Sequence, residues 1–133
     1  MRKIKFRGKE YDGTWHAGDL YTRNGEDFII REYYIDRHTI WDCMVDPDTI
    51  GQFTGQYDKR GKEIYEGDIV KYEHFIKGDL VYQIVWNEYK SSFMRQRMTD
   101  DGTVFAPLHM TDYVTIIGNI HDNPELLKEG GES

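Results

Sequence analysis

The sequence predicts a mainly β protein, with an SH3-like small β-barrel in the C-terminal half, a smaller β-rich N-terminal part and a short C-terminal helical turn. Aromatic residues are abundant, with ten Tyr, six Phe and three Trp, and such side chains fit a pleated sheet better than a helix. Short apolar–polar alternating segments are separated by turns rich in Gly and Asp, as in small antiparallel barrels and sandwiches. The pattern alone does not separate an SH3-like barrel from an OB-like one.

Residues 1–48 are expected to form the N-terminal lobe. A strand is predicted at residues 4–6, where Ile4 and Phe6 face one side. Residues 19–23 and 27–31 flank Asn24-Gly25, which indicates a hairpin because a type I′ turn needs positive φ at both central residues. Residues 32–44 show neither a strand nor a helix period, so a short helix and an irregular strand pair both stay open. Pro47 restricts the chain and marks the end of the lobe.

Residues 49–122 are expected to form the barrel, and residues 123–133 a short helical turn with a frayed tail. Asn123 is a suitable cap, Pro124 suits the first helical position, and Glu125 favours the positive end of the helix dipole. Within the barrel, strands are predicted at residues 49–53, 68–73, 80–86, 93–98, 104–108 and 113–117.

Composition limits the classes of function. The formal net charge of the 133 residues is −7, which disfavours general binding to duplex nucleic acid. The sequence contains no run of about 20 apolar residues, the length needed to span a bilayer, so no membrane partner is expected. Cys43 is the single cysteine and cannot form an intrachain disulfide, which suits a reducing compartment such as the cytoplasm. Asp42 and Met44 flank it, so a structural role is favoured over a nucleophilic one.

No motif for catalysis or cofactor binding is present, and we expect neither an enzyme nor a bound cofactor. The histidines are far apart in the sequence, and there is no HExxH or CxxC. Only a metal site assembled from distant histidines and carboxylates stays open. His16 with Asp19 could form a general base and its orienting carboxylate, but a surface histidine beside a turn acid is favoured. The histidines are His16, His38, His74, His109 and His121.

One strand offers a candidate face for nucleic acid or a protein partner. Alternation along residues 93–98 places Phe93, Arg95 and Arg97 on one side. An aromatic ring with two guanidinium groups on a small barrel is a plausible single-strand platform. The acidic body of the chain makes a solvated face or a protein contact the favoured interpretation.

The segment from residue 50 to residue 70 contains a cluster of turn residues. The spacing of its glycines does not fit a phosphate-binding loop. We interpret the glycines as allowing positive φ where strands reverse, and its acids as pairing with nearby Lys and Arg rather than binding a cation. The residues of this fold-signature turn are Gly51, Gly55, Asp58, Gly61, Gly67 and Asp68.

Several blocks in a fixed order carry a resemblance to a known family. They are MRKIKFR at residues 1–7, IGQFTG at 50–55, DKRGKEIYEGDIV at 58–70, VW at 85–86 and IGNIHDNPELL at 117–127. The chain resembles the YopX-like proteins of phages and prophages of Gram-positive bacteria along nearly its whole length. It departs from the family after Arg7, where Gly8-Lys9 replaces a family-like Ala-Trp.

The resemblance implies a phage or prophage protein with an SH3-like barrel that acts as a self-associating accessory protein, and it carries over no catalytic residues. We therefore expect a non-enzymatic homo-oligomer that could also bind a host or phage protein. Trp15, Trp41 and Tyr57 are candidate interface aromatics, whereas Tyr65 and Trp86 are expected to fill the barrel. The alternative is a nucleic-acid-binding module that uses Phe93, Arg95, Arg97 and the basic N-terminus.

Overall fold

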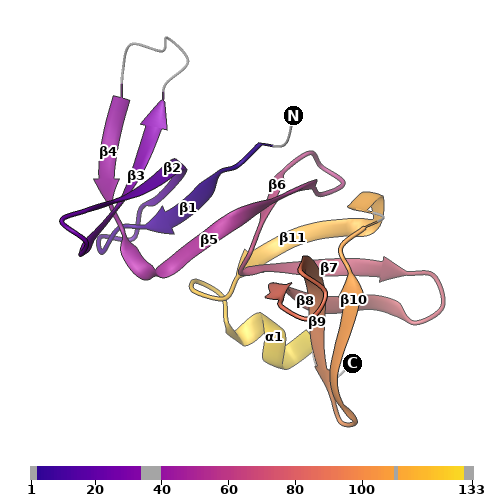
Figure 1. The fold of residues 1–133 in the computed structure, drawn as a ribbon. Helices are drawn as coiled ribbons and strands as arrows, with labels where there is room; N and C mark the ends of the chain where they lie inside the picture. Colours follow the sequence, from indigo (N-terminus) through magenta and orange to yellow (C-terminus); the bar gives the residue numbers. More distant parts are fainter. Residues whose placement is uncertain (1–2, 34–39, 110, 131–133) are drawn as a thin grey trace. The chain divides into compact units, whose positions relative to one another are not determined.

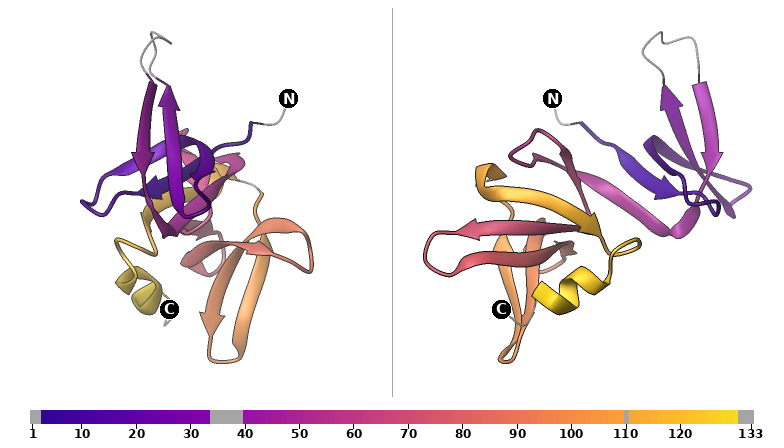
Figure 2. Two further views of the ribbon diagram at one scale, coloured as in Figure 1. Left: turned by 60° about the vertical axis from the view of Figure 1, so that its left-hand side comes forward. Right: turned by 180° about the vertical axis from the view of Figure 1, so that it is seen from behind.

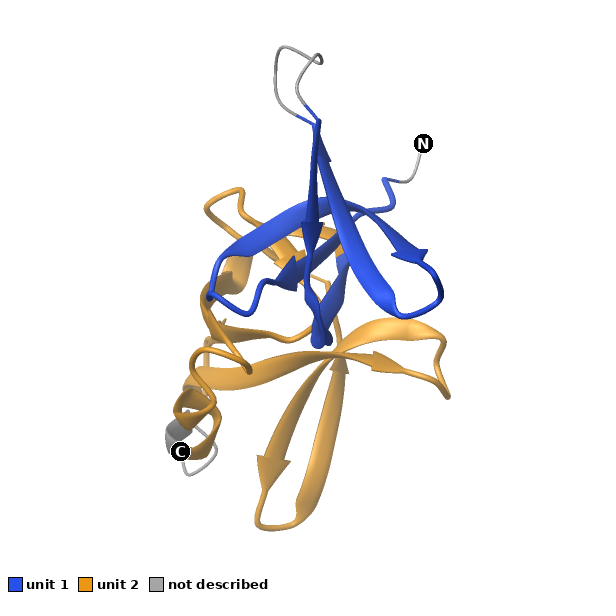
Figure 3. Cartoon of the chain, turned by 90° about the vertical axis from the view of Figure 1, so that its left-hand side faces the viewer, with its two compact units in different colours: residues 1–53 blue, residues 54–133 orange. Residues whose placement is uncertain are grey.

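The computed structural model describes residues 3–33, 40–109 and 111–130. It is mainly β, with two antiparallel sheets and, among these residues, one short α-helix (Figure 1). The chain divides into two compact units, residues 1–53 and residues 54–133 (Figure 3). The limits predicted at residues 48 and 122 stay predictions.

Unit 1 is an antiparallel sheet in which consecutive strands are mostly neighbours, in the order β4-β3-β2-β1-β5. Strand β1 pairs with both β2 and β5, and β4 is the edge strand. The first strand begins two residues later than the sequence predicted. The bounds are Phe6–Lys9 for β1, Trp15–Arg23 for β2, Asp27–Tyr33 for β3, Ile40–Met44 for β4 and Asp46–Tyr57 for β5, whose last four residues belong to unit 2.

The hairpin predicted at Asn24-Gly25 joins β2 to β3. Arg23 pairs with Asp27, and Asn24 and Gly25 have φ values of 56° and 71°. The N–H of Glu26 donates to the Arg23 carbonyl at 3.2 Å. Positive φ at both central residues matches the right-handed twist of the flanking strands, so the prediction is confirmed.

The ambiguous segment 32–44 forms strands wherever the structure describes it. Residues 32–33 end β3 and residues 40–44 are β4, while residues 34–39 lie outside the described residues. Pro47 lies within a strand, β5, which continues to Tyr57. It lies near the start of β5 in a register shift opposite β1, where a missing N–H removes no ladder hydrogen bond.

A few apolar side chains form the buried part of unit 1. Gly8 of β1 lies against Val45, where a Cβ at residue 8 would be 2.7 Å from Val45 Cγ2. This close approach explains why β1 carries a glycine at that position. The buried apolar side chains are those of Ile29, Ile30, Cys43, Val45 and Phe53.

Unit 2 contains a five-stranded antiparallel sheet in the order β10-β9-β8-β7-β11. The short β6 pairs with the end of β5. The bounds are Glu63–Tyr65 for β6, Asp68–His74 for β7, Gly78–Asn87 for β8, Ser92–Thr99 for β9, Gly102–Pro107 for β10 and Val114–Asn119 for β11, which follows the 3-10 helix Thr111–Tyr113.

The mainly β class is confirmed, but no closed barrel is found among the described residues. Strands β10 and β11 lie at the two edges of the sheet, and no pairing there joins them. Alternation in a sequence predicts where strands run and which face is apolar. Closure depends instead on strand tilt and register stagger, which alternation does not report.

The core of unit 2 forms on one face of its sheet, because residues two apart on a strand share a face. Tyr72 and Phe93 pack against its margin. The core consists of Ile64, Val70, Leu80, Tyr82, Ile84, Leu108, Val114 and Ile116.

The predicted C-terminal helical turn is observed as α1, Glu125–Gly130, which packs against β8 (Figure 2). Leu127 lies beside Val81 and Met98. Asn123 differs from the expected cap, since its Oδ1 accepts a hydrogen bond from the Asn119 N–H at 3.3 Å. No helix in the described part of the chain is long and apolar enough to cross a membrane.

Candidate functional site

The face predicted for nucleic acid is part of the core side of unit 2. Phe93, Arg95 and Arg97 share one face of β9, as alternation predicted, but that face carries the buried cluster. Arg95 is only 6% exposed, and Phe93 packs against the core and against Trp86, with ring centroids 5.0 Å apart. The three side chains therefore do not form the solvated platform that a single strand needs.

The guanidinium of Arg95 lies between two tyrosine rings. Its Cζ is 3.9 Å from the ring centroid of Tyr72 and 4.7 Å from that of Tyr82. Its Nε donates to the Pro107 carbonyl at 3.2 Å. A cation over aromatic faces is attracted by the ring quadrupoles, by about 2 kcal/mol when desolvated. Arg95 therefore joins β7, β8 and β10 rather than presenting a charge to a ligand.

A hollow of about 420 Å³ opens beside this arginine–tyrosine stack. Phe75 at its margin is 92% exposed and Tyr113 is 46% exposed, and the His74 and Phe75 rings are stacked. It is an aromatic hollow that also contains one carboxylate and one imidazole. Its lining residues are Tyr72, Glu73, His74, Phe75 and Tyr113.

The candidate interface aromatics differ in exposure. Trp15 is half-buried in unit 1, with Arg7 Cζ 5.0 Å from its ring centroid. Trp41 in β4 is 55% exposed, and Tyr57 at the end of β5 is 45% exposed. Tyr65 is buried as expected, whereas Trp86 is 43% exposed, so the prediction that it fills the interior is wrong.

Strand β4 carries an unusual number of exposed apolar side chains for an edge strand. Ile40 is 52% exposed and Met44 is 48% exposed, and Tyr33, opposite Ile40, is 55% exposed. The Phe28 carbonyl accepts from Val45 just beyond the strand. An edge strand presents a row of backbone groups to solvent, and proteins commonly protect such edges with Lys or Pro. The sequence of β4, IWDCM, contains neither.

The charged residue of β4 is neutralised within the sheet. Arg31 Nε donates to Asp42 Oδ1 at 2.8 Å, and Tyr21 Oη donates to Asp42 Oδ2 at 2.8 Å. The hydrogen bonds from Arg31, followed by that from Tyr21, lower the pKa of Asp42 to about 2. The carboxylate therefore adds little net repulsion along this edge.

The fold-signature turn is structural. Gly55, Gly61 and Gly67 have φ values of 87°, 81° and 93°. Gly61 and Gly67 lie between strands, which confirms their turn interpretation. Gly55 lies inside β5 despite its positive φ, and Gly51 lies inside β5 opposite Arg7 without positive φ. The buried Asp68 accepts from the Tyr65 N–H at 2.7 Å.

Asp58 fixes the first turn of this segment. Its side chain is fully buried. Oδ1 accepts from the N–H groups of Arg60 and Lys62, both at 2.9 Å, and Oδ2 accepts from the N–H of Ile116 at 3.1 Å. Burial raises the pKa of Asp58, but the backbone donors, Ile116 first, and the nearby Arg60 outweigh it and leave the pKa below its ordinary value.

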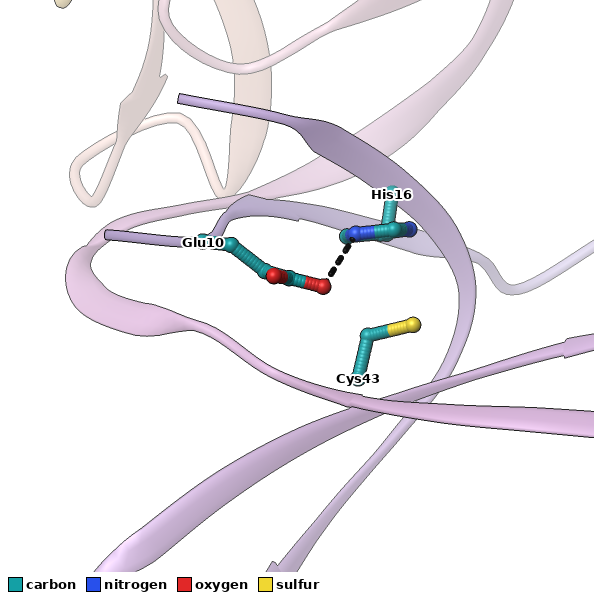
Figure 4. A group of neighbouring side chains, drawn as sticks. All are labelled: Glu10, His16 and Cys43. Atoms are coloured by element: carbon teal, nitrogen blue, oxygen red, sulfur yellow. Dashed lines mark ion pairs between the residues drawn. The ribbon is translucent and has the colours of Figure 1, made fainter. Parts of the chain in front are cut away.

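A cluster in unit 1 combines ligand-type side chains that are distant in the sequence. A ring nitrogen of His16, a carboxylate oxygen of Glu10 and the Sγ of Cys43 all lie within 4.8 Å of one another. Figure 4 shows the three side chains around one space. We call Glu10, His16, Glu32 and Cys43 the unit 1 cluster.

Four successive parts of unit 1 supply the cluster. Glu10 follows β1 in a turn held by hydrogen bonds from its N–H to the Thr14 carbonyl and from the Gly13 N–H to its own carbonyl, both 2.9 Å. His16, Glu32 and Cys43 come from the neighbouring strands β2, β3 and β4.

His16 lies between two carboxylates. Its Nδ1 is 2.6 Å from Glu32 Oε1, and its Nε2 is 2.6 Å from Glu10 Oε1. Asp19, the partner in the disfavoured general-base alternative, is three residues further along β2, exposed, and paired in register with Arg31. Strand alternation separates residues three apart onto opposite faces, so the structure does not support a His16–Asp19 pair.

Cys43 is the buried member of the cluster, with 9% of its surface exposed. Burial, followed by the negative charges of Glu32 and Glu10, raises the pKa of the Cys43 thiol to about 11. Such a thiol is a poor nucleophile at neutral pH. The interpretation of Cys43 as structural rather than nucleophilic agrees with this environment.

Motif spacing could not reveal this cluster, because its members lie at positions 10, 16, 32 and 43. The hairpin at Asn24-Gly25 offered a partial signal. Once the turn is placed, pairing brings Glu32 onto the strand beside His16. The position of Cys43 depends on β4, whose strand state the sequence left open.

The fold defines a class of protein: a mainly β chain with two antiparallel sheets. The YopX protein family matches residues 5–128, and the chain belongs to that family. The crystal structure of protein EF1440 from Enterococcus faecalis is similar, with a TM-score of 0.51 and 22% identity over 96% of this chain and 99% of that chain. This likeness shows a shared fold. None of the curated proteins compared with the chain matches it.

Proposed function

We propose that this chain is a non-enzymatic, phage-associated accessory protein that works by associating with itself, in the reducing interior of the host cell. Membership in the YopX family supports the phage association. The observation that carries the self-association is the apolar edge strand β4. A host or phage protein is the other partner that such an edge could accept.

The geometry of β4 suits a second copy of the chain. Two identical edge strands can pair antiparallel about a two-fold axis, and each then satisfies the backbone groups of the other. Ile40 and Met44 lie two register positions on either side of Asp42 and share its face. In a two-fold pair centred near Asp42, Ile40 of one copy would therefore approach Met44 of the other.

The test is the mass of the protein in solution over a range of concentrations, measured by light scattering with a chelator present. Wild type is expected to exceed the monomer mass and to dissociate on dilution. Ile40→Lys with Met44→Lys places two charges on the edge and is expected to give a monomer. The matched control is Val104→Lys in β10, another edge strand, where Val104 is 40% exposed.

Two results would count against the proposal. A wild type that is monomeric at every concentration would remove self-association and leave the heterologous partner, which pull-down from infected cells would then identify. An Ile40→Lys/Met44→Lys variant that keeps the wild-type mass would place the interface elsewhere.

The nucleic-acid alternative has less support. Arg95 is held between Tyr72 and Tyr82, and Phe93 packs on the core. Arg97 is half-buried, whereas Arg95 is buried. A salt-dependent retention of wild type on single-stranded DNA, reduced by Arg97→Ala, would favour this alternative over self-association.

A further inference from the structure

The chemistry of the unit 1 cluster points to a ligand. It gathers a thiol, an imidazole and two carboxylates on one side of a small sheet. Each of these side-chain types binds metal ions. Without a cation, the cluster holds the carboxylates of Glu10 and Glu32 close together, where they repel each other. Three of the four come from separate strands, so the sheet itself holds their spacing.

The two nitrogens of His16 have different surroundings. Nδ1 makes a hydrogen bond with Glu32 Oε1 at 2.6 Å. Nε2 is buried and lacks a hydrogen bond within the described residues, although Glu10 Oε1 is 2.6 Å away. The Glu10 oxygen therefore lies off the axis along which an Nε2 proton would point. A doubly paired imidazolium would leave that proton unsatisfied, which is costly for a buried donor.

A cation on the Nε2 side removes this conflict. Histidine that binds a metal commonly donates its other N–H to a carboxylate, which fixes the tautomer and the ring orientation. Glu32 occupies that position at Nδ1, which leaves the Nε2 lone pair free to bind. Glu10 Oε1 is 2.6 Å from Nε2, and Cys43 Sγ lies within 4.8 Å of a ring nitrogen of His16 and of a Glu10 oxygen (Figure 4).

The donor set selects the class of metal. Thiolate, imidazole and carboxylate together suit Zn²⁺, whereas Mg²⁺ and Ca²⁺ take oxygen ligands. Bonds of about 2.0–2.3 Å in a tetrahedron place ligand atoms roughly 3.3–3.8 Å apart. In the structure the three ligand atoms lie within 4.8 Å of one another, and Glu10 Oε1 is 2.6 Å from Nε2. Zinc binding therefore requires Glu10 Oε1 to move away from Nε2 and the Cys43 side chain to adjust.

We propose that Glu10, His16 and Cys43 bind one zinc ion, and that Glu32 is a positioning residue that orients His16. Three protein ligands leave the fourth position for water. The thiol loses its proton on binding, and the ion balances the charges of the thiolate and Glu10. Zinc would also link the turn after β1 to β2 and β4, and so stabilise unit 1.

The experiment measures zinc uptake by the full chain after treatment with a chelator. We expect one zinc per chain, a rise in the unfolding temperature on adding zinc, and a thiolate-to-metal absorption band when Co²⁺ replaces zinc. Cys43→Ser and His16→Gln are each expected to weaken zinc binding at least 100-fold. Cys43→Ser is expected to abolish the thiolate-to-metal band, and His16→Gln to abolish zinc uptake. Glu32→Gln is expected to weaken binding about 10–100-fold while keeping the band.

His109→Gln is the matched control, since His109 is exposed in unit 2 and its loss should leave zinc uptake unchanged. Glu10→Gln alters a ligand on a turn and not in a strand, so it tests the site should Cys43→Ser fail to fold. A wild type that takes up no zinc at micromolar concentrations, or a folded Glu10→Gln or Cys43→Ser variant with wild-type affinity, would overturn the proposal. Light scattering with chelator tests self-association separately, so each proposal can fail without the other.

Discussion

At the scale of single residues, the polar groups inside this protein hold turns and neighbouring strands together. Asp58 and Asp68 each accept backbone N–H groups in the segment that the sequence identified as a turn, and Arg95 joins three strands. The sequence predicted turns there because Gly and Asp are typical turn residues. It could not predict that Asp58 would reach Ile116, which is 58 positions away, because that contact exists only once the sheet has formed.

Asp58→Asn is expected to destabilise unit 2 by about 2–3 kcal/mol at pH 7, since hydrogen bonds to a charged acceptor contribute about that much each and an amide NH₂ would face an N–H donor. The pKa of Asp58 is lower in the folded protein than the ordinary 3.8. Its contribution is therefore fully present above the unfolded pKa and is lost as the pH falls through the folded pKa.

Urea unfolding at several pH values checks this prediction. Wild type should lose stability below about pH 4 more steeply than Asp58→Asn does. The exposed Asp100→Asn serves as the control, and it should follow wild type. An Asp58→Asn variant whose stability falls with pH as steeply as that of wild type would show that Asp58 does not carry the effect.

At the scale of elements, alternation and turn residues predicted most strands of unit 2, and the structure extends several of them by one to three residues. The β2–β3 hairpin was predictable because Asn24-Gly25 is a local signal. Strand β4 and the unit 1 cluster were not, because Ile40, Trp41 and Met44 are apolar but exposed. An edge strand with apolar side chains on both faces has no alternation to read.

Gly18→Ala is expected to destabilise unit 1 by about 3 kcal/mol, at the upper end of the cost of overpacking. A Cβ at residue 18 would be 2.0 Å from the Arg31 carbonyl oxygen, so β3 would have to move away from β2. Gly61→Ala is the comparison, because residue 61 has open space and a φ of 81°, and it should cost about 1–2 kcal/mol. Urea unfolding midpoints measure both, and equal losses would show that β3 moves without cost.

At the scale of the whole molecule, the mainly β class follows from composition and alternation, but the closed barrel does not. The strand order β10-β9-β8-β7-β11 leaves two open edges, and local patterns carry no information about closure. The two compact units also differ in their buried apolar side chains. Among the described residues, the core cluster of unit 2 contains eight such side chains, whereas unit 1, which spans 53 residues, contains five.

Small domains bury a smaller fraction of their surface and are less stable. We therefore expect unit 1 to unfold first when urea is raised in the presence of chelator. Hydrogen exchange followed by mass spectrometry should show peptides of β2 and β3 losing protection at a lower urea concentration than peptides of β7 and β8. Coincident loss in both units would mean that the chain unfolds as one cooperative body.

The burial of Cys43 has a practical consequence. It is the single thiol of the chain, it lies inside unit 1, and in the zinc-free protein its raised pKa of about 11 keeps it unreactive at neutral pH while that unit is closed. A reagent that modifies thiols can then label the protein only when unit 1 opens. The rate at which Cys43 is labelled in the unmodified protein therefore measures how often unit 1 opens.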